Sequence, residues 1–207
     1  MLKNNLILLE GKKQLIFAIL ILFLGFFYKP FFYVGSLIII FLVFFFRNPE
    51  RSFEISDESI ICPADGTIIE IKNLENEWDK RISIFMSPFD VHINWVPISG
   101  KIVNEKYSAG KFKAAFLPKS SELNEHNDIE ILDAKGRKIL VRQIAGFFAR
   151  RIVCWNKIND NVEQGQKFGM IKFSSRVDIF VPKGFESIIV LGQRVYGGST
   201  ILGKWRK

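Results

Sequence analysis

The first 48 residues constrain this chain most, because they are almost purely apolar. Residues 15–28 form an unbroken apolar run apart from one glycine, and residues 31–46 form a second run with a single serine. As a helix, each run reaches about 21–24 Å at 1.5 Å per residue, which is shorter than the roughly 30 Å hydrocarbon core of a bilayer. Lys29-Pro30 separates the two runs. The pattern therefore predicts a helical membrane hairpin within residues 1–48, which either spans a thin bilayer or dips into it.

The charge around the predicted hairpin points to a lipid surface. Residues 1–51 carry six basic and two acidic side chains, so they supply +4 of the formal net charge of +8. Basic residues on both flanks of an apolar segment favour anionic lipid and the cytoplasmic side of the membrane. The other +4 is spread over the rest of the chain, whereas a nucleic-acid-binding domain concentrates its positive charge. We therefore predict a protein of the cell membrane, with its soluble part on the cytoplasmic side and no nucleic-acid partner.

Beyond Asn48-Pro49 the pattern changes to short β-type runs separated by Gly, Pro, Asn and Asp. Residues 81–84, Arg-Ile-Ser-Ile, alternate polar and apolar side chains, as a half-buried strand does. The polar segment 120–128 predicts a surface loop. Residues 49–207 are therefore predicted to form a mainly β domain, a compact sandwich or barrel. Its strands are expected at residues 67–72, 81–86, 91–96, 101–105, 138–144, 151–155, 168–173, 177–181 and 186–190.

The few cysteines and histidines of the chain limit which residues could bind a metal or act as a general base. The chain has two cysteines, Cys62 and Cys154, without metal-ligand spacing, and we expect both to be buried thiols. Of its two histidines, His126 lies in the polar segment and is expected to be solvated. His92 lies in a strand-like run beside Asp90 and is the strong general-base candidate. So few histidines make a metal site hard to assemble, and none is expected.

Three other segments carry groups suited to chemistry, and each also has an ordinary structural explanation. Asp65 lies in an Ala-Asp-Gly turn that enters a strand. The run Ser174-Ser175-Arg176 offers hydroxyls and a guanidinium to a phosphate, or belongs to a plain hairpin. The string Gly197-Gly198-Ser199-Thr200 is a flexible tail, or it places a hydroxyl nucleophile beside an unhindered peptide bond.

In this order, the segments resemble the short form of phosphatidylserine decarboxylases found in many bacteria and archaea. The resemblance covers nearly the whole chain, from the apolar N-terminal segment to the last residues. Each motif alone is weak, whereas their order and their position relative to the C-terminus are specific. The motifs are Phe45–Arg51, Pro63–Gly66, Ser87–His92, Gly165–Pro182 and Gly197–Thr200.

The resemblance implies a precursor that cuts itself at the Gly198-Ser199 bond. The Ser199 hydroxyl would attack the Gly198 carbonyl, and β-elimination would then release the upstream chain. The products would be a β chain, residues 1–198, and an α chain, residues 199–207, whose first residue has become a pyruvoyl cofactor. Family members act on phosphatidylserine, so the expected reaction is its decarboxylation to phosphatidylethanolamine, with no metal or added cofactor. Expected partners are a serine phospholipid, the membrane, and further αβ units in a homo-oligomer.

The same resemblance assigns roles to individual residues. His92 would be the base and Asp65 the group that orients it, so that both act with Ser199. Ser174, Ser175 and Arg176 would bind the substrate. Longer bacterial members carry a second histidine three positions after the first, and this chain has Trp95 there. The duties of that second histidine would therefore fall to His92 or to another group.

Two rival functions fit parts of the sequence. A membrane-anchored adaptor of the lipoyl- or biotinyl-like kind also uses Pro-Ala-Asp-Gly turns and glycine-spaced hairpins. This hypothesis predicts an intact chain and a dispensable Ser199, and it leaves the terminal Gly-Gly-Ser-Thr string unexplained. A metallopeptidase-like β domain is the second rival, and the scarcity of histidines argues against it.

Overall fold

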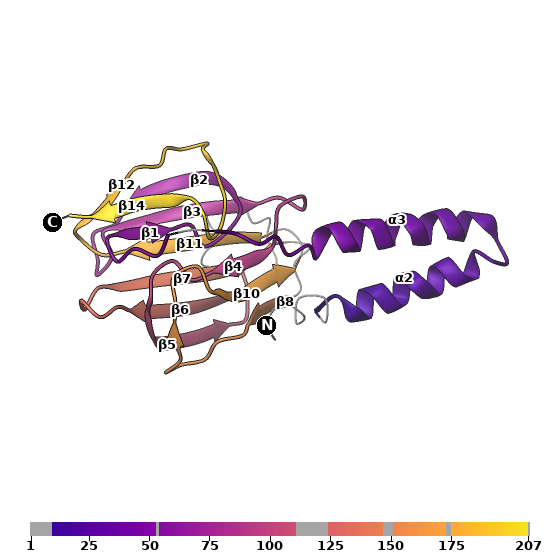
Figure 1. Cartoon of the computed structure of the whole chain (residues 1–207), viewed down its shortest axis with the longest axis horizontal. Coiled ribbons are helices and arrows are strands. Elements are labelled where there is room, and N and C mark those ends of the chain that lie inside the picture. The colour runs from indigo at the N-terminus through magenta and orange to yellow at the C-terminus, as the bar shows by residue number, and fades with distance from the viewer. Residues whose placement is uncertain (1–9, 53, 111–123, 147–150, 173–174, 207) are drawn as a thin grey trace. The chain divides into compact units, whose positions relative to one another are not determined.

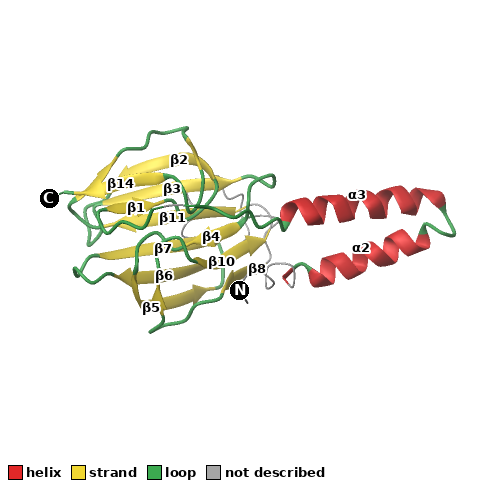
Figure 2. Cartoon of the chain, in the orientation of Figure 1, coloured by secondary structure: helices red, strands yellow, loops and turns green. Residues whose placement is uncertain are grey.

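The computed structural model describes residues 10–52, 54–110, 124–146, 151–172 and 175–206. The chain divides into two units, Met1–Glu50 and Arg51–Lys207. The described part of the first unit is helical, and that of the second consists of strands and loops (Figure 1, Figure 2). The prediction of a mainly β chain that begins with a helical hairpin is confirmed at this level.

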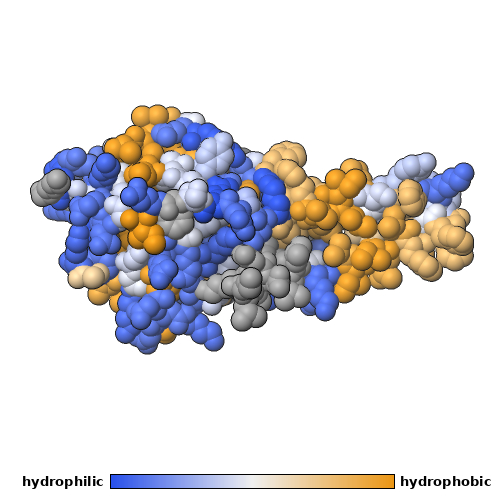
Figure 3. Space-filling view, viewed as in Figure 1, coloured by the Kyte–Doolittle hydropathy of each residue, from blue (hydrophilic) through white to orange (hydrophobic). Residues whose placement is uncertain are grey.

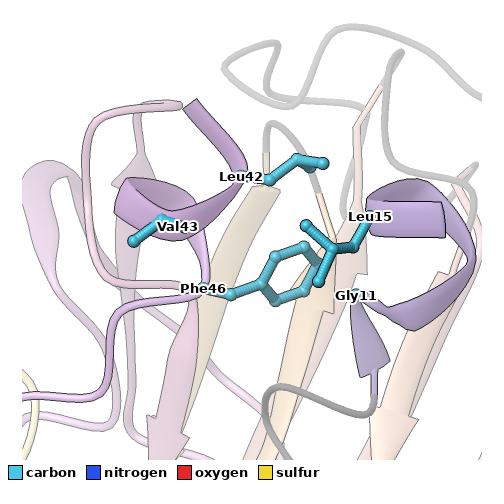
Figure 4. Close-up of a pocket in the computed structure, with 5 residues that line it drawn as sticks. All are labelled: Gly11, Leu15, Leu42, Val43 and Phe46. Carbon is cyan, nitrogen blue, oxygen red and sulfur yellow. The ribbon is translucent and has the colours of Figure 1, made fainter. Parts of the chain in front are cut away.

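The described part of the first unit contains two packed helices, α2 (Lys12–Leu24) and α3 (Lys29–Phe45). Pro30 occupies the first turn of α3, where its missing N–H costs no helical hydrogen bond. Figure 4 shows the opposite end of the pair, where the Phe46 ring points toward Leu15 and Gly11. A small apolar cavity of about 30 Å³ remains there.

The helices of this pair do not support the spanning form of the predicted membrane hairpin. Among the residues that the structure describes, no helix combines the length and the apolar character needed to cross a membrane. Many apolar side chains of the pair are nevertheless exposed, and Figure 3 shows them along both helices.

The described part of the second unit contains fourteen strands, all paired antiparallel, in three sheets. The largest sheet has the order β13-β2-β3-β11-β7-β6-β5-β9, and the smaller ones are β1-β14-β12 and β4-β10-β8. The strands are β1 (Ser59–Ile61), β2 (Gly66–Asn73), β3 (Lys80–Met86), β4 (Ile93–Trp95), β5 (Gly100–Ser108), β6 (His126–Leu132), β7 (Lys138–Ala145), β8 (Arg151–Cys154), β9 (Asn161–Val162), β10 (Lys167–Lys172), β11 (Ser175–Val181), β12 (Phe185–Ser187), β13 (Arg194–Val195) and β14 (Ile201–Trp205).

One hydrophobic core joins the three sheets. In the largest sheet, Ile179 of β11 pairs with Ile82 of β3 on one side and with Val141 of β7 on the other. All three side chains are fully buried, in one cluster with Ile60 of β1 and Ile171 of β10. Because every sheet contributes to this cluster, the strands that carry the candidate site are fixed by a common core.

The prediction of a loop over residues 120–128 is wrong for its last part. His126 begins β6, and it is half-buried rather than solvated. Asp128 lies opposite Arg142 of β7 and forms an ion pair with it at 2.7 Å. The polar residues therefore belong to a strand because their partners lie on the neighbouring strand. Residues 120–123 lie outside the described part of the chain.

Candidate active site

The string Gly197-Gly198-Ser199 forms a tight turn between β13 and β14. The backbone N–H groups of Ser199 and Thr200 donate to the carbonyl of Tyr196, at 3.2 and 2.9 Å. The N–H of Tyr196 in turn donates to the hydroxyl of Thr200 at 2.9 Å. Gly198 has a φ of +70°, a conformation that glycine adopts without steric cost. These bonds make the segment an ordered turn rather than a flexible tail.

The segment from Cys62 to Asp65 holds this turn in place. The Cys62 carbonyl accepts the N–H of Gly198 at 2.9 Å, and the Cys62 N–H donates to the Thr200 carbonyl at 2.7 Å. The Oδ1 atom of Asp65 accepts the N–H of Gly197 at 2.8 Å. The structure thus brings two sequence-predicted features together, the Asp65 carboxylate and the glycine turn.

Trp95 explains why the turn needs two glycines. A Cβ atom on Gly197 would lie 2.4 Å from Cε3 of Trp95, and one on Gly198 would lie 2.8 Å from its Cδ1. Both distances are shorter than any ordinary carbon contact. An indole N–H is a donor only, so Trp95 has no site that accepts a proton. Where longer bacterial members carry a second histidine, this chain therefore has Trp95, whose ring packs against the glycine turn.

Arg51 contacts both the carboxylate and the turn. Its Nη2 atom pairs with Oδ2 of Asp65 at 2.7 Å, and its Nη1 atom donates to the Gly197 carbonyl at 2.9 Å. The guanidinium carbon lies 4.9 Å from the ring centroid of Trp95 and 5.8 Å from that of Tyr196. The side chains of Arg51 and Asp65 are only 12% and 5% exposed, so the pair is shielded from water.

His92 is held by the loop that precedes it. Its ring is buried, and Nδ1 lies 2.9 Å from the carbonyl oxygen of Asp90. A carbonyl only accepts, so Nδ1 donates its proton to it, and in the neutral ring Nε2 carries the lone pair that a base needs. The Asp90 carboxylate accepts the Ser87 N–H at 2.7 Å and forms an ion pair with Arg194 of β13. The hydrogen bond to Asp90 raises the pKa of Arg194, which therefore stays charged.

The three residues predicted to act together are not directly bonded to one another. The described atoms of His92, Asp65 and Ser199 form no hydrogen bond between any two of these side chains. Both carboxylate oxygens of Asp65 are engaged by Arg51 and Gly197, and Ser199 is exposed. Catalytic hydrogen bonds often form only as the reacting state is approached. The orientation of His92 by Asp65 stays a prediction.

Two residues of the predicted substrate-binding run, Ser175 and Arg176, lie in strand β11. Ser174 is outside the described residues, and the buried Ser175 hydroxyl donates to the sulfur of Met86 at 3.5 Å. Arg176 is 1% exposed, and its guanidinium donates to Asp178 at 2.6 Å and to the Ser83 hydroxyl at 2.7 Å. The contacts with Met86 and Ser83 join β11 to β3, the contact with Asp178 lies within β11, and none of the three involves a residue of the glycine turn. The role of the run in substrate binding stays a prediction.

Comparison with known proteins decides the family of this chain. The model of the phosphatidylserine decarboxylase family matches residues 38–203. The chain belongs to the phosphatidylserine decarboxylase family. A Methanosarcina barkeri protein that carries the name of an archaetidylserine decarboxylase proenzyme is 46% identical over 84% of this chain and 82% of its own length. Phosphatidylserine decarboxylase proenzymes of Geotalea uraniireducens and Syntrophus aciditrophicus are 44% and 43% identical, each over 79% of both chains.

Membership of the decarboxylase family confirms the resemblance that the motif order predicted, and with it the prediction of an enzyme. The residue that sequence reasoning missed is Arg51. It ends the motif Phe45–Arg51, which contributed to the resemblance without any role for its residues. A motif without an assigned role was therefore the signal that pointed to it.

Among the groups around the turn, the Cys62 thiol is unsuited to act as a nucleophile. The Cys62 thiol donates to the Ala64 carbonyl at 3.0 Å, and burial raises its pKa to about 12. A thiol with such a pKa is almost never ionised at neutral pH and is a poor nucleophile. The part of the chain that the structure describes also holds no cluster of three metal-binding side chains. The role of Ser199 as the nucleophile stays a prediction.

Proposed function

We propose that this chain is a precursor that cuts itself between Gly198 and Ser199 and then decarboxylates a serine phospholipid. One observation carries the proposal, the fixed turn in which a left-handed glycine precedes an exposed serine. Membership of the phosphatidylserine decarboxylase family and the proenzyme names of its relatives support it. Those relatives carry names for two lipid backbones, so the proposal concerns the serine headgroup that both names share.

The proposed cleavage needs no oxidant and consumes one water. The Ser199 hydroxyl attacks the Gly198 carbonyl, its proton passes to His92, the freed nitrogen takes up a proton, and the amide becomes an ester. Loss of the α-proton of residue 199 then expels Gly198 as the carboxylate that ends residues 1–198. The dehydroalanine left behind takes up water and releases ammonia, which leaves a pyruvoyl group. The Asp65 carboxylate supports the attack by fixing the Gly197 N–H.

The small downstream fragment, residues 199–207, has the contacts to stay bound after the cut. Its strand β14 pairs with β1 on one side and with β12 on the other. Leu202 is completely buried and Trp205 is 8% exposed, and both belong to the main core. A pyruvoyl group at residue 199 would therefore remain just before the start of β14, next to the turn that Trp95 and Asp65 contact. Such a group supplies a carbonyl that draws electrons from the amino acid headgroup while carbon dioxide leaves.

The first test is intact-mass spectrometry of the freshly purified full chain beside a Ser199→Ala variant. We expect two fragments, divided after Gly198, with a pyruvoyl group in place of serine on the smaller one. The alanine variant has no attacking hydroxyl and is expected to stay whole. A single intact mass for the folded wild-type chain would contradict the proposal and favour the membrane-anchored adaptor.

We also propose that the helical unit binds the lipid surface where the substrate lies. Phe17 and Phe26 are 63% and 87% exposed, and burial of one phenylalanine contributes about 1.5–3 kcal/mol. The full-length Phe26→Glu variant is therefore expected to bind anionic phospholipid vesicles at least about tenfold more weakly in flotation. Phe89→Glu is the matched control, because Phe89 is 70% exposed in the other unit. Equal binding by Phe26→Glu and the wild-type chain would reject a lipid-binding hairpin.

A further inference from the structure

The ion pair of Arg51 and Asp65 holds both polar groups of a single peptide residue. Asp65 accepts the N–H of Gly197 at 2.8 Å, and Arg51 donates to the carbonyl of the same residue at 2.9 Å. The two side chains are joined to each other at 2.7 Å. Both the N–H and the carbonyl of Gly197 are therefore hydrogen-bonded to charged side chains. The two peptide planes that meet at Gly197 cannot rotate without breaking one of these bonds.

Gly197 lies one residue before the bond that is proposed to be cut, which joins Gly198 to Ser199. Rotation about Gly197 would change the direction of the Gly198 carbonyl that Ser199 is proposed to attack, and two glycines in sequence offer little resistance of their own. Trp95 supports the turn from one side, and the Arg51 guanidinium lies over the faces of Trp95 and Tyr196. Arg51 thus contacts the Trp95 ring, the Asp65 carboxylate and the Gly197 carbonyl at once.

This set of contacts requires the shape of arginine. A guanidinium donates from two nitrogens in one plane and stacks on aromatic faces, whereas a lysine is a single point of charge. Lysine at this position is able to pair with Asp65 or to reach the Gly197 carbonyl, but it lacks the planar fork that does both. The geometry therefore distinguishes a positioning role from a simple need for positive charge.

We propose that Arg51 is a positioning residue for the self-cleavage, one that fixes the Gly198 carbonyl for attack by Ser199. The inference rests on the proposed function. It assigns no proton transfer to Arg51, which contacts Gly197 and not the reacting atoms. A small displacement of a reacting group from its productive geometry costs about 100-fold in rate. The Arg51→Ala precursor is therefore expected to cleave about 100-fold more slowly than the wild-type chain.

The chain offers a closely matched control in Arg137. Its Nε atom pairs with Asp133 at 2.6 Å, its Nη2 atom donates to the Asp57 carbonyl at 2.6 Å, and its guanidinium lies 4.5 Å from the ring centroid of Trp205. Arg137 thus has the same three kinds of contact as Arg51, with none of them to the glycine turn. Removal of either arginine takes away similar interactions, and only Arg51 is expected to affect cleavage.

The experiment follows the appearance of the fragments over time for full-length wild-type, Arg51→Ala, Arg51→Lys and Arg137→Ala chains, by mass spectrometry. We expect slow cleavage of Arg51→Ala, an intermediate rate for Arg51→Lys and a wild-type rate for Arg137→Ala. Guanidinium chloride, far below concentrations that unfold the protein, is expected to restore part of the Arg51→Ala rate. Thermal unfolding of each variant is measured alongside, because a merely unfolded chain would not be rescued by this ion.

The outcomes of this experiment distinguish a failure of the positioning role of Arg51 from a failure of the proposed self-cleavage. A wild-type chain that is cut, together with an Arg51→Ala chain that is cut equally fast, overturns the positioning role alone. Equal slowing by Arg51→Ala and Arg137→Ala, or slowing without any guanidinium rescue, also overturns it, because a general loss of stability would then explain the effect. A folded wild-type chain that is never cut overturns the proposed function and this inference with it.

Discussion

The His92→Ala precursor is expected to remain whole on the timescale on which the wild-type chain is completely processed. The ring keeps its proton on Nδ1 through the Asp90 carbonyl, so Nε2 is the nitrogen that is able to accept a proton from Ser199. A positioned general base contributes about 10²- to 10⁴-fold to the rate of such a step. Cleavage is measured by intact-mass spectrometry after incubation of the purified precursor. We expect added imidazole to restore part of the rate, because it supplies the missing base.

The other histidine provides the control for this variant. Nδ1 of His126 lies 2.8 Å from the carbonyl of Asn124, two residues earlier, just as Nδ1 of His92 lies 2.9 Å from that of Asp90. His126→Ala therefore removes the same local contact from a residue with no proposed role, and it is expected to be processed normally. A His92→Ala chain that is fully processed would refute the role of His92 as the cleavage base.

The strand pattern of the β domain was largely predictable, because alternation of apolar residues marks strands that lie on a core. The segment expected at residues 81–86 appears as β3 over Lys80–Met86. Strand β6 was missed because its first residues are polar, and their partners are remote in sequence. Asn127 donates to Gln143 at 3.3 Å, and Asp128 pairs with Arg142. A pattern within one segment does not show that a neighbouring strand will satisfy its polar side chains.

Strand β14 was missed for a related reason. Its sequence, Ile-Leu-Gly-Lys-Trp, contains a glycine and follows a glycine-rich turn, so local propensity favours a tail. The segment becomes a strand through pairing with β1 and β12, whose residues lie elsewhere in the chain. This pairing matters for the proposed function, because β14 belongs to the small fragment and is hydrogen-bonded to a strand on each side.

The candidate site was only partly predictable, because contacts between distant segments define it. The glycine pair, Ser199, His92 and Asp65 were all expected from motifs, and the structure places Asp65 on the turn. The contact between Arg51 and Gly197 joins residues 146 positions apart. The steric role of Trp95 also depends on a segment about a hundred residues away. Motifs indicate which residues matter, and packing decides what each of them touches.

The Asp65→Asn precursor is expected to lose both stability and cleavage. The asparagine oxygen is able to retain the N–H of Gly197, but its amide group leaves Arg51 without a charged partner. Removal of one member of a buried ion pair costs about 3–5 kcal/mol, and with side chains 12% and 5% exposed we expect the lower end, about 3 kcal/mol. Urea unfolding measures the loss of stability, and intact-mass spectrometry measures cleavage.

The partly buried pair of Asp133 and Arg137 provides a control that separates the loss of stability from the loss of cleavage. Asp133 is 7% exposed, pairs with Arg137, and accepts the backbone N–H groups of Lys135 and Arg137. Asp133→Asn is therefore expected to lose comparable stability while its cleavage rate stays close to that of the wild-type chain. If Asp133→Asn slowed cleavage as much as Asp65→Asn, the loss would reflect a weaker fold rather than a disturbed turn.

The double variant Arg51→Ala/Asp65→Asn decides between two roles of Asp65. The carboxylate contacts Arg51 and Gly197, so we expect it to act through the turn. In that case Arg51→Ala, Asp65→Asn and the double variant cleave at similar rates, because each breaks the same ion pair. If Asp65 also orients His92 during the reaction, Asp65→Asn and the double variant will both be slower than Arg51→Ala. That result would restore the direct coupling of Asp65, His92 and Ser199 that the motifs predicted, and it would mean that the pair with Arg51 opens before the serine attacks.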